Sequence, residues 1–137
     1  MNTLSVLLMG LVMFFWGSSV IFDKLGLKKI SAIEVLFWAS LAPFVGALAL
    51  IISKGKLSFS EPKNILWSLL AGLLGFLGLL VFFILLKKYP ASQVTPIVAL
   101  YPVITVVLGI IFFSEKLLWY QILGLIFALA GVFLLTK

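Results

Sequence analysis

Five apolar runs, each long enough to cross a lipid bilayer, dominate this sequence. They cover residues 4–22, 33–52, 65–86, 94–113 and 117–135, and none has a charged residue near its middle. A helix rises about 1.5 Å per residue, so runs of roughly 18–22 residues span a hydrocarbon core of about 30 Å. The sequence therefore predicts an all-α, multi-pass membrane protein with five transmembrane helices and no room for a soluble domain. The first run lacks a basic leader and is too long for the core of a cleaved signal peptide, so we interpret it as a permanent helix.

Composition supports this prediction and excludes several function classes. Hydrophobic residues make up 64% of the chain and charged residues only 10%, whereas a soluble domain carries about 25% charged residues. The absence of cysteine and histidine removes thiol nucleophiles, imidazole metal ligands and the usual general base near neutral pH. The sequence contains no catalytic triad, metal-ligand cluster or phosphate-binding glycine loop, and its short basic connectors offer no nucleic-acid-binding face. We expect no enzyme activity, cofactor, metal or nucleic-acid partner.

The positive charges, all lysines, give only a weak indication of orientation. Orientation normally follows an excess of basic residues in the cytoplasmic loops. Two interpretations remain open: a single orientation with the lysine-richer side in the cytoplasm, or insertion in both orientations. With five crossings, the lysine-richer side holds Lys24, Lys28, Lys29, Lys87, Lys88 and Lys137, and the other side holds Lys54, Lys56, Lys63 and Lys116.

Insertion in both orientations would matter because the number of predicted helices is odd. Two copies that face opposite ways form a pair related by an axis in the membrane plane, which is the inverted-repeat arrangement of many transporters. The sequence is thus compatible with an antiparallel homodimer.

Polar and aromatic residues gather in the half of the membrane next to the lysine-richer side. Polar groups in hydrocarbon are tolerated mainly where they face protein or a water-filled cavity. We interpret this group as the lining of a substrate path. The alternative is that the aromatic residues form an interfacial belt and that each serine bonds its own helix. The group comprises Trp16, Gly17, Ser18, Ser19, Trp38, Thr95 and Tyr101.

Three prolines spaced six residues apart, Pro90, Pro96 and Pro102, lie in or beside the fourth run. Proline removes a backbone donor and disrupts the preceding helical turn. Pro90 lies in a connector, and Pro96 is predicted at the first helical position with Thr95 as N-cap, where a missing donor costs little. Pro102 falls inside the run, frees the carbonyl of Val98 and should kink the helix. We therefore expect this helix to bend around an opening, and we include Pro96 and Pro102 in the candidate path.

Small residues recur at helical spacing on three of the runs. Such residues let transmembrane backbones approach closely. The pattern predicts tight helix packing but does not say whether the partner is the same chain or another. The candidate packing residues are Ala39, Ala42, Gly46, Gly72, Gly75, Gly78, Gly124, Ala128 and Gly131.

Local structure accounts for the acidic residues. Ser31 and Glu34 have the spacing of a capping box where the second helix begins. The tripeptide Ser60-Glu61-Pro62 is typical of another helix start. No pair of carboxylates lies at membrane depth, so proton or sodium coupling through a buried acid has no evident carrier.

Several short motifs follow one another along the five predicted helices: Trp16-Gly17-Ser18-Ser19, Pro90-Ala91-Ser92, Pro96, Glu115-Lys116 and the segment from Gly124 to Gly131. In this order they resemble one EamA domain of the drug/metabolite transporter superfamily, and the likeness runs nearly end to end. The resemblance implies a single transmembrane domain over residues 1–137 that forms one half of a ten-helix inverted-repeat transporter. It also implies that the Trp16–Ser19 turn and the Thr95–Pro102 stretch line a central substrate path.

The chain departs from its apparent relatives at two places. Members of the family often carry an arginine in the second helix, but this chain reads VLFWASLAP there, which puts an anion-binding or gating role of that arginine in doubt. The related small multidrug resistance proteins use a membrane-embedded glutamate in the first helix. Its absence here gives no support to coupled export of cationic drugs by that route.

These observations predict a transporter of small organic metabolites or drug-like solutes that works by alternating access as an antiparallel homodimer in the cell membrane of a prokaryote. Its partners are the lipid bilayer, a small-molecule substrate and a second copy. Two alternatives stay open: a flippase subunit for a lipid-linked headgroup, with a groove open to lipid, and an assembly subunit with no path of its own. We expect a self-contained half-size protein; half of a longer protein is the alternative.

Overall fold

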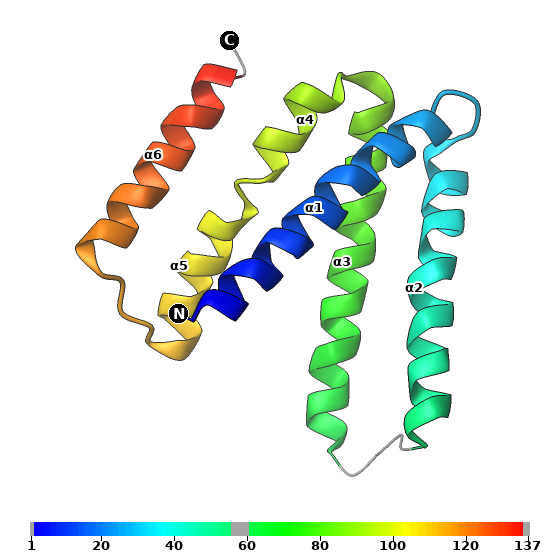
Figure 1. The fold of residues 1–137 in the computed structure, drawn as a ribbon, viewed down its shortest axis with the longest axis horizontal. Helices are drawn as coiled ribbons and strands as arrows, with labels where there is room; N and C mark the ends of the chain where they lie inside the picture. Colours follow the sequence, from blue (N-terminus) through cyan, green and yellow to red (C-terminus); the bar gives the residue numbers. More distant parts are fainter. Residues whose placement is uncertain (1, 56–60, 136–137) are drawn as a thin grey trace. The chain divides into compact units, whose positions relative to one another are not determined.

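The computed structural model of the chain describes residues 2–55 and 61–135, and these residues form only helices and their connections. The chain divides into two compact units, residues 1–88 and residues 89–137. The predicted all-α class is thus confirmed, and the fourth predicted segment is built from two helices. The helices are α1 (Thr3–Gly26), α2 (Ala32–Lys54) and α3 (Pro62–Lys88) in the first unit, and α4 (Ala91–Val98), α5 (Tyr101–Phe113) and α6 (Trp119–Leu135) in the second (Figure 1).

Four segments in the described chain are long and apolar enough to cross a membrane: α1, α2, α3 and the α4–α5 pair. The fifth segment is shorter than predicted, because α6 has 17 residues and begins two residues later than expected. The reason is local. Ser114 ends α5 in the left-handed conformation, with φ of 54°. The side-chain oxygen of Gln121 then accepts a 2.8 Å hydrogen bond from the Leu118 N–H and caps the start of α6.

The three helices of the first unit meet at one end, where α1 ends, α2 begins and α3 ends (Figure 1). A Cβ added to Gly26 would lie 3.3 Å from Val35 Cγ2, so α1 ends close against the first turn of α2. The end of α1, the start of α2 and the end of α3, which the sequence places on the lysine-richer side, therefore lie close together. The buried apolar residues at this end are Leu27, Ala32, Val35, Leu36, Phe83 and Leu86.

Two lysines join these segments through backbone carbonyls. Lys24 Nζ donates a hydrogen bond to the carbonyl of Leu86 near the end of α3. Lys87 Nζ donates to the carbonyl of Ile30, between α1 and α2, at 3.0 Å. The last carbonyls of a helix lack partners and carry partial negative charge, so an ammonium group near Leu86 is favourable.

The capping box predicted for the second helix is confirmed. The Glu34 N–H donates to Ser31 Oγ at 3.2 Å, and the Ser31 N–H donates to Glu34 Oε2 at 2.8 Å. From this start α2 runs through Pro43 to Lys54, and Gly55 with φ of 65° ends it. Ser60 of the other predicted helix start lies outside the described residues, as do Lys56 and Lys137.

Candidate functional site

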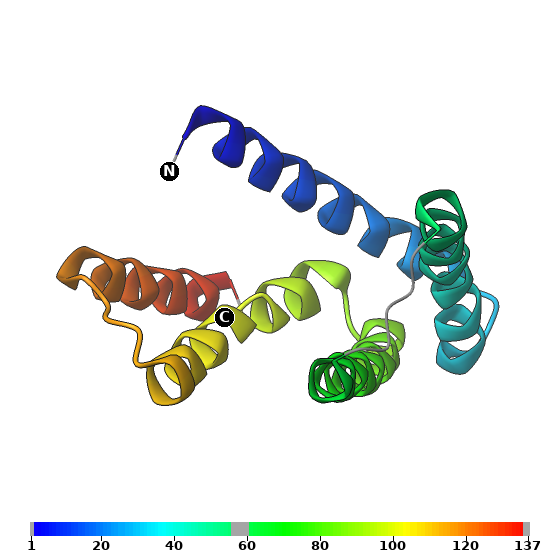
Figure 2. The same cartoon turned by 90° about the horizontal axis from the view of Figure 1, so that it is seen from below.

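The fourth span is interrupted between α4 and α5, as Figures 1 and 2 show. The Ala99 N–H still donates to the Thr95 carbonyl at 2.8 Å. In two of the following hydrogen bonds the N–H reaches back only three residues. The Leu100 N–H donates to the Ile97 carbonyl at 3.2 Å, and the Val103 N–H donates to the Leu100 carbonyl at 2.9 Å. The regular ladder, in which each N–H reaches back four residues, therefore stops at residues 99–100.

This interruption leaves two backbone carbonyls without their helical donors. The carbonyl of Val98 would accept from residue 102, which is Pro102 and has no N–H. The carbonyl of Ala99 would accept from Val103, whose N–H instead bonds Leu100. Broken backbone bonds at membrane depth persist where protein, water or a ligand satisfies them. The break is thus a place where acceptor oxygens are available inside a span.

Pro96 lies inside a helix and Pro102 lies in a first helical turn, the reverse of the positions that the sequence predicts. Pro96 was expected at the first helical position with Thr95 as N-cap, and this is wrong: Pro96 lies inside α4, which already begins at Ala91. The reason is that the carbonyl of Pro90 accepts the N–H groups of residues 93 and 94, at 3.0 and 3.1 Å, and so starts the helix early. Pro102 occupies the first turn of α5, where its missing donor costs little. The predicted disruption before Pro102 is confirmed.

Thr95 contributes a polar atom beside the break. Its Oγ1 is buried and has no hydrogen-bond partner within the described chain. Buried polar groups are nearly always hydrogen-bonded, so such an atom calls for an explanation. Tyr101, one residue after the break, is exposed, and its carbonyl accepts a 3.4 Å bond from Thr105 Oγ1. Thr95 and Pro96 thus lie in the last turns of α4, before the interruption, and Tyr101 and Pro102 lie in the first turn of α5, after it.

The other predicted path residues belong to the first unit. Trp16 on α1 and Trp38 on α2 are 64% and 63% exposed, and Ser18 is half-buried. Ser19 Oγ donates to the Trp16 carbonyl at 2.9 Å. The alternative that a serine bonds its own helix is therefore correct for Ser19. Because each unit is described by itself, a path shared by the Trp16–Ser19 group and the Thr95–Pro102 group stays a prediction.

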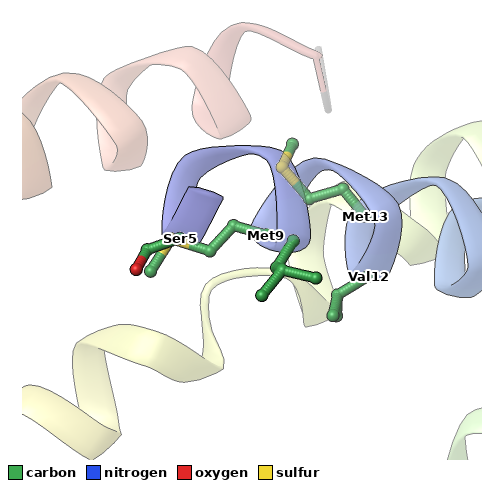
Figure 3. Close-up of a pocket in the computed structure, with 5 residues that line it drawn as sticks. Ser5, Met9, Val12 and Met13 are labelled. Atoms are coloured by element: carbon green, nitrogen blue, oxygen red, sulfur yellow. The ribbon is translucent and has the colours of Figure 1, made fainter. Parts of the chain in front are cut away.

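An apolar hollow of about 470 Å³ lies on one face of α1 (Figure 3). Its lining residues recur at intervals of three and four, which places them along one stripe of the helix. Ser5 is the single polar contributor, and its hydroxyl donates to Asn2 Oδ1 at 2.7 Å. The hollow therefore suits an apolar occupant. It is lined by Ser5, Leu8, Met9, Val12 and Met13.

The predicted packing residues lie on exposed helix surfaces. At each of the glycines among them, an added Cβ would meet no atom within 4 Å. These small-residue surfaces are thus not covered by other described residues of the chain. The residues are Ala39, Ala42, Gly46, Gly72, Gly75, Gly78, Gly124, Ala128 and Gly131.

Two parts of this site were missed by sequence reasoning. Pro102 indicated that the Val98 carbonyl would be free, but nothing in the sequence indicated that the Val103 N–H would shift to Leu100 and free Ala99 as well. The α1 hollow was also missed. Its only signal was the regular spacing of Leu8, Met9 and Met13, which any lipid-facing helix shows.

The model of the EamA-like transporter family matches residues 3–137. The chain belongs to the EamA-like transporter family. Over 129 residues it is 28% identical to an uncharacterized protein of the archaeon Methanocaldococcus jannaschii, an alignment that covers 92% of this chain and 91% of that protein. No solved structure matches the sequence significantly.

Family membership gives the apolar helices their function. As an EamA-like transporter, the protein is a multi-pass membrane protein of a non-enzymatic transporter family, and its partners are a lipid bilayer and a transported solute. In this EamA-like chain, the acceptor oxygens at the α4–α5 break can bind a donor group or a cation, and the apolar faces can contact lipid or another helix.

Proposed function

We propose that an antiparallel homodimer of this chain moves small organic metabolites or drug-like solutes across the cell membrane of a prokaryote by alternating access. Each chain acts as a single transmembrane domain and supplies one half of a ten-helix inverted repeat. The observation that carries the proposal is the interrupted fourth span, in which the Thr95 hydroxyl is buried and has no hydrogen-bond partner among the described residues. Discontinuous helices at the midplane are the usual place where transporters bind their substrates.

The proposed path combines the break with the Trp16–Ser19 turn of α1. Carbonyls at residues 98 and 99 accept hydrogen bonds, while Trp16, Trp38 and Tyr101 offer aromatic surface. Such a lining suits neutral or zwitterionic solutes that carry donor groups and an apolar part. The full set is Trp16, Gly17, Ser18, Ser19, Trp38, Thr95, Pro96, Tyr101 and Pro102.

Uncovered small-residue surfaces support the homodimer. Gly46 on α2, Gly75 on α3 and Gly131 on α6 each have no atom within 4 Å of an added Cβ. Close approach of such surfaces is what drives transmembrane helices to associate in the absence of a hydrophobic force between them. A second copy of the chain is the partner that a half-size transporter requires.

The lysine distribution supports opposite orientations for the two copies. Of the ten lysines, six lie on one predicted side and four on the other. A strong positive-inside bias would fix one orientation. A weak bias lets one gene supply both halves.

The orientation of the copies can be measured directly, because the chain contains no cysteine. Asn2→Cys, before α1, and Gly55→Cys, after α2, lie on the same predicted side of the membrane and serve as two independent single labelling sites. Whole cells are treated with a membrane-impermeant maleimide, and each site is scored as labelled from outside or protected. Dual insertion predicts that about half the copies are labelled at each site.

Flux completes the test. The purified chain is reconstituted in liposomes and assayed for uptake of amino acids and drug-like amines. Lys54→Gln combined with Lys63→Gln leaves two of the four lysines on the lysine-poorer side, against six on the other, and should force one orientation. This variant alone should lose flux, and co-expression with a variant biased the other way should restore it. If every wild-type copy faces one way and no solute moves, the proposal is wrong, and an assembly role without a path replaces it.

A flippase for a lipid-linked headgroup is the second candidate, and the α1 hollow favours it. The hollow is open and lined by one helix only, and its apolar surface along Leu8, Met9 and Val12 suits contact with an acyl or isoprenoid chain. The test is mass spectrometry of lipids that copurify with the chain. The variant Val12→Trp fills the hollow and should abolish lipid retention; an exposed position on the same helix, Phe22→Trp, serves as control. Equal lipid content in all three proteins would exclude this candidate.

A further inference from the structure

Lysines gather at the end of the first unit where its three helices meet, and we propose that this end binds the headgroups of anionic phospholipids. The acyl chains of these lipids lie against the exposed apolar residues of the same end. The proposal goes beyond membership of a membrane-protein family, because it names the class of lipid and the part of the chain that binds it. It does not depend on transport. The lysine cluster comprises Lys24, Lys28, Lys29, Lys87 and Lys88.

The first step is that the fold brings the basic segments together. Lys24 Nζ, in the last turn of α1, donates to the carbonyl of Leu86 near the end of α3. Lys87 Nζ donates at 3.0 Å to the carbonyl of Ile30, in the connection between α1 and α2. These partners are 62 and 57 residues apart in the sequence. The lysines of the connection and those of the last turn of α3 therefore belong to one surface of the folded unit.

The second step is that part of the lysine cluster remains available to a ligand. The side chains of Lys28, Lys29 and Lys88 are exposed, and within residues 2–55 and 61–135 they make no hydrogen bond or ion pair. The carboxylates at this end are Asp23 and Glu34. Five lysines and two carboxylates give this end a net charge of +3. Basic clusters between transmembrane helices attract anionic lipid headgroups.

The third step is the exposed apolar surface next to the lysine cluster. Ile84 precedes Lys88 by four residues, so the two side chains share one face of α3. Leu25 and Ile33, on either side of the α1–α2 connection, are exposed as well, as is Ile84. A phospholipid has the same order of groups, with a charged headgroup at the interface and apolar chains below it. A free anion would use the lysines alone, so the surface fits a lipid better.

The chemistry of lysine agrees with this partner. An ammonium group is a compact charge on a flexible stem and carries three donors, so it can bind a phosphate oxygen by itself. The lysines therefore do not have to converge on one atom, and each can contact a headgroup that approaches the surface. A lipid with net negative charge, such as phosphatidylglycerol, should bind more tightly than the zwitterionic phosphatidylcholine.

The test measures lipid binding to the purified full chain in a neutral detergent. Phosphatidylglycerol and phosphatidylcholine with identical acyl chains are compared by native mass spectrometry, which counts bound lipids, and by thermal unfolding. A lipid that binds the folded state raises the unfolding temperature in a saturable way. We expect tighter binding of phosphatidylglycerol. Higher ionic strength should weaken this preference, because salt screens exposed charges.

Two matched triple variants locate the binding surface. Lys28→Gln, Lys29→Gln and Lys88→Gln together should weaken phosphatidylglycerol binding by about tenfold or more. The control combines Lys54→Gln, Lys63→Gln and Lys116→Gln, which removes the same charge from the lysine-poorer side and should leave binding close to that of the wild type. Arginine at the three positions of the first variant keeps the charge and should keep the preference, which separates loss of charge from loss of folding.

Three results would overturn the proposal. One is equal binding of the two lipids to the wild type. Another is equal weakening by the two glutamine triples, which would show attraction to total charge alone. The third is that soluble glycerol phosphate stabilises the chain as strongly as phosphatidylglycerol does, because the surface would then bind free anions. Each readout is made without solute flux, so failure of the lipid surface leaves the transporter proposal intact.

Discussion

Lys87 Nζ, in the last turn of α3, donates a 3.0 Å hydrogen bond to the carbonyl of Ile30 between α1 and α2. The bond from Lys24 to Leu86 runs in the opposite sense, from the last turn of α1 to the end of α3. The two bonds and the buried residues Phe83 and Leu86 belong to the same end of the unit, where the first three helices meet. This end of the first unit is therefore held by both polar and apolar contacts.

Replacing Lys87 should weaken this end slightly. Lys87→Met removes the bond to Ile30 but keeps an unbranched apolar stem of similar length, so we expect a loss of about 0.5–1 kcal/mol in the free energy of unfolding. The measurement is equilibrium unfolding in mixed micelles titrated with sodium dodecyl sulfate. Lys88→Met is the control, since it removes the same charge at the next position. Equal stabilities of the two variants would contradict the assigned role of Lys87.

Truncation of Phe83 should have a larger effect. Its side chain is 2% exposed, and loss of a buried aromatic ring costs about 3 kcal/mol through lost contacts and the cavity left behind. Phe76→Ala on the same helix is the control, because Phe76 is 49% exposed. The same titration should show a shift of at least 1 kcal/mol between the two variants, and a smaller one would place the core elsewhere.

Two serines of the α2 region should respond differently to alanine. Ser31 Oγ accepts from the N–H of Glu34, which has no partner within the helix, so Ser31→Ala should destabilise by about 1 kcal/mol. Ser40 Oγ donates at 2.7 Å to the carbonyl of Leu36, a bond that duplicates a helical one, so Ser40→Ala should be nearly neutral. Hydrogen exchange at residues 33–35 gives a second readout: these amides should exchange faster only in Ser31→Ala.

Removing Pro102 should join α4 and α5. Alanine at this position supplies the N–H that the Val98 carbonyl lacks and favours one continuous helix. Amides of residues 99–103 should then exchange with deuterium more slowly, and solute flux should fall by about tenfold or more if bending is needed for alternating access. Pro43→Ala in α2 controls for the loss of a proline elsewhere in the membrane. If hydrogen exchange slows but solute flux is unchanged, the break between α4 and α5 is not needed for transport.

A larger side chain at Gly26 should crowd the junction of α1 and α2. Because an added Cβ would lie only 3.3 Å from Val35 Cγ2, Gly26→Leu should cost about 1–3 kcal/mol through overpacking. Gly10→Leu on the same helix has open space around it and should leave stability unchanged or raise it. An unfolding titration should show that Gly26→Leu is less stable than Gly10→Leu. The reverse order would contradict the close contact between Gly26 and Val35.

Much of the fold follows from hydrophobic run length. The predicted first three helices agree with α1, α2 and α3 to within a few residues at each end, because a bilayer sets their minimum length. The Ser31–Glu34 box was equally readable, since its two hydrogen bonds need only one spacing. Family membership was also readable from ordered motifs, and the family match confirms it.

Prediction failed where two local solutions compete. Pro96 and Pro102 can each occupy a first helical turn, and the Thr95–Pro96 pair has the better capping residue. Instead, α4 begins directly after Pro90, whose carbonyl accepts N–H groups of the first turn, and Pro102 occupies the first turn of α5. The start of α6 was likewise predicted two residues too early, since the side chain of Gln121 accepts from the Leu118 N–H and caps the helix at Trp119. The orientation and partners of Trp16 and Trp38 depend on neighbours that sequence spacing does not specify.

The brevity of α6 makes bilayer thickness a variable for this protein. A helix of 17 residues is about 25 Å long, so it falls about 5 Å short of an average hydrocarbon core. Lipids must thin around such a helix, or its flanking side chains must stretch to the interface, at a cost of fractions of a kcal/mol per Å. Shorter acyl chains relieve that deformation, and so does coverage of α6 by protein. The acyl-chain length of the lipids should therefore affect how strongly α6 associates with a neighbouring helix.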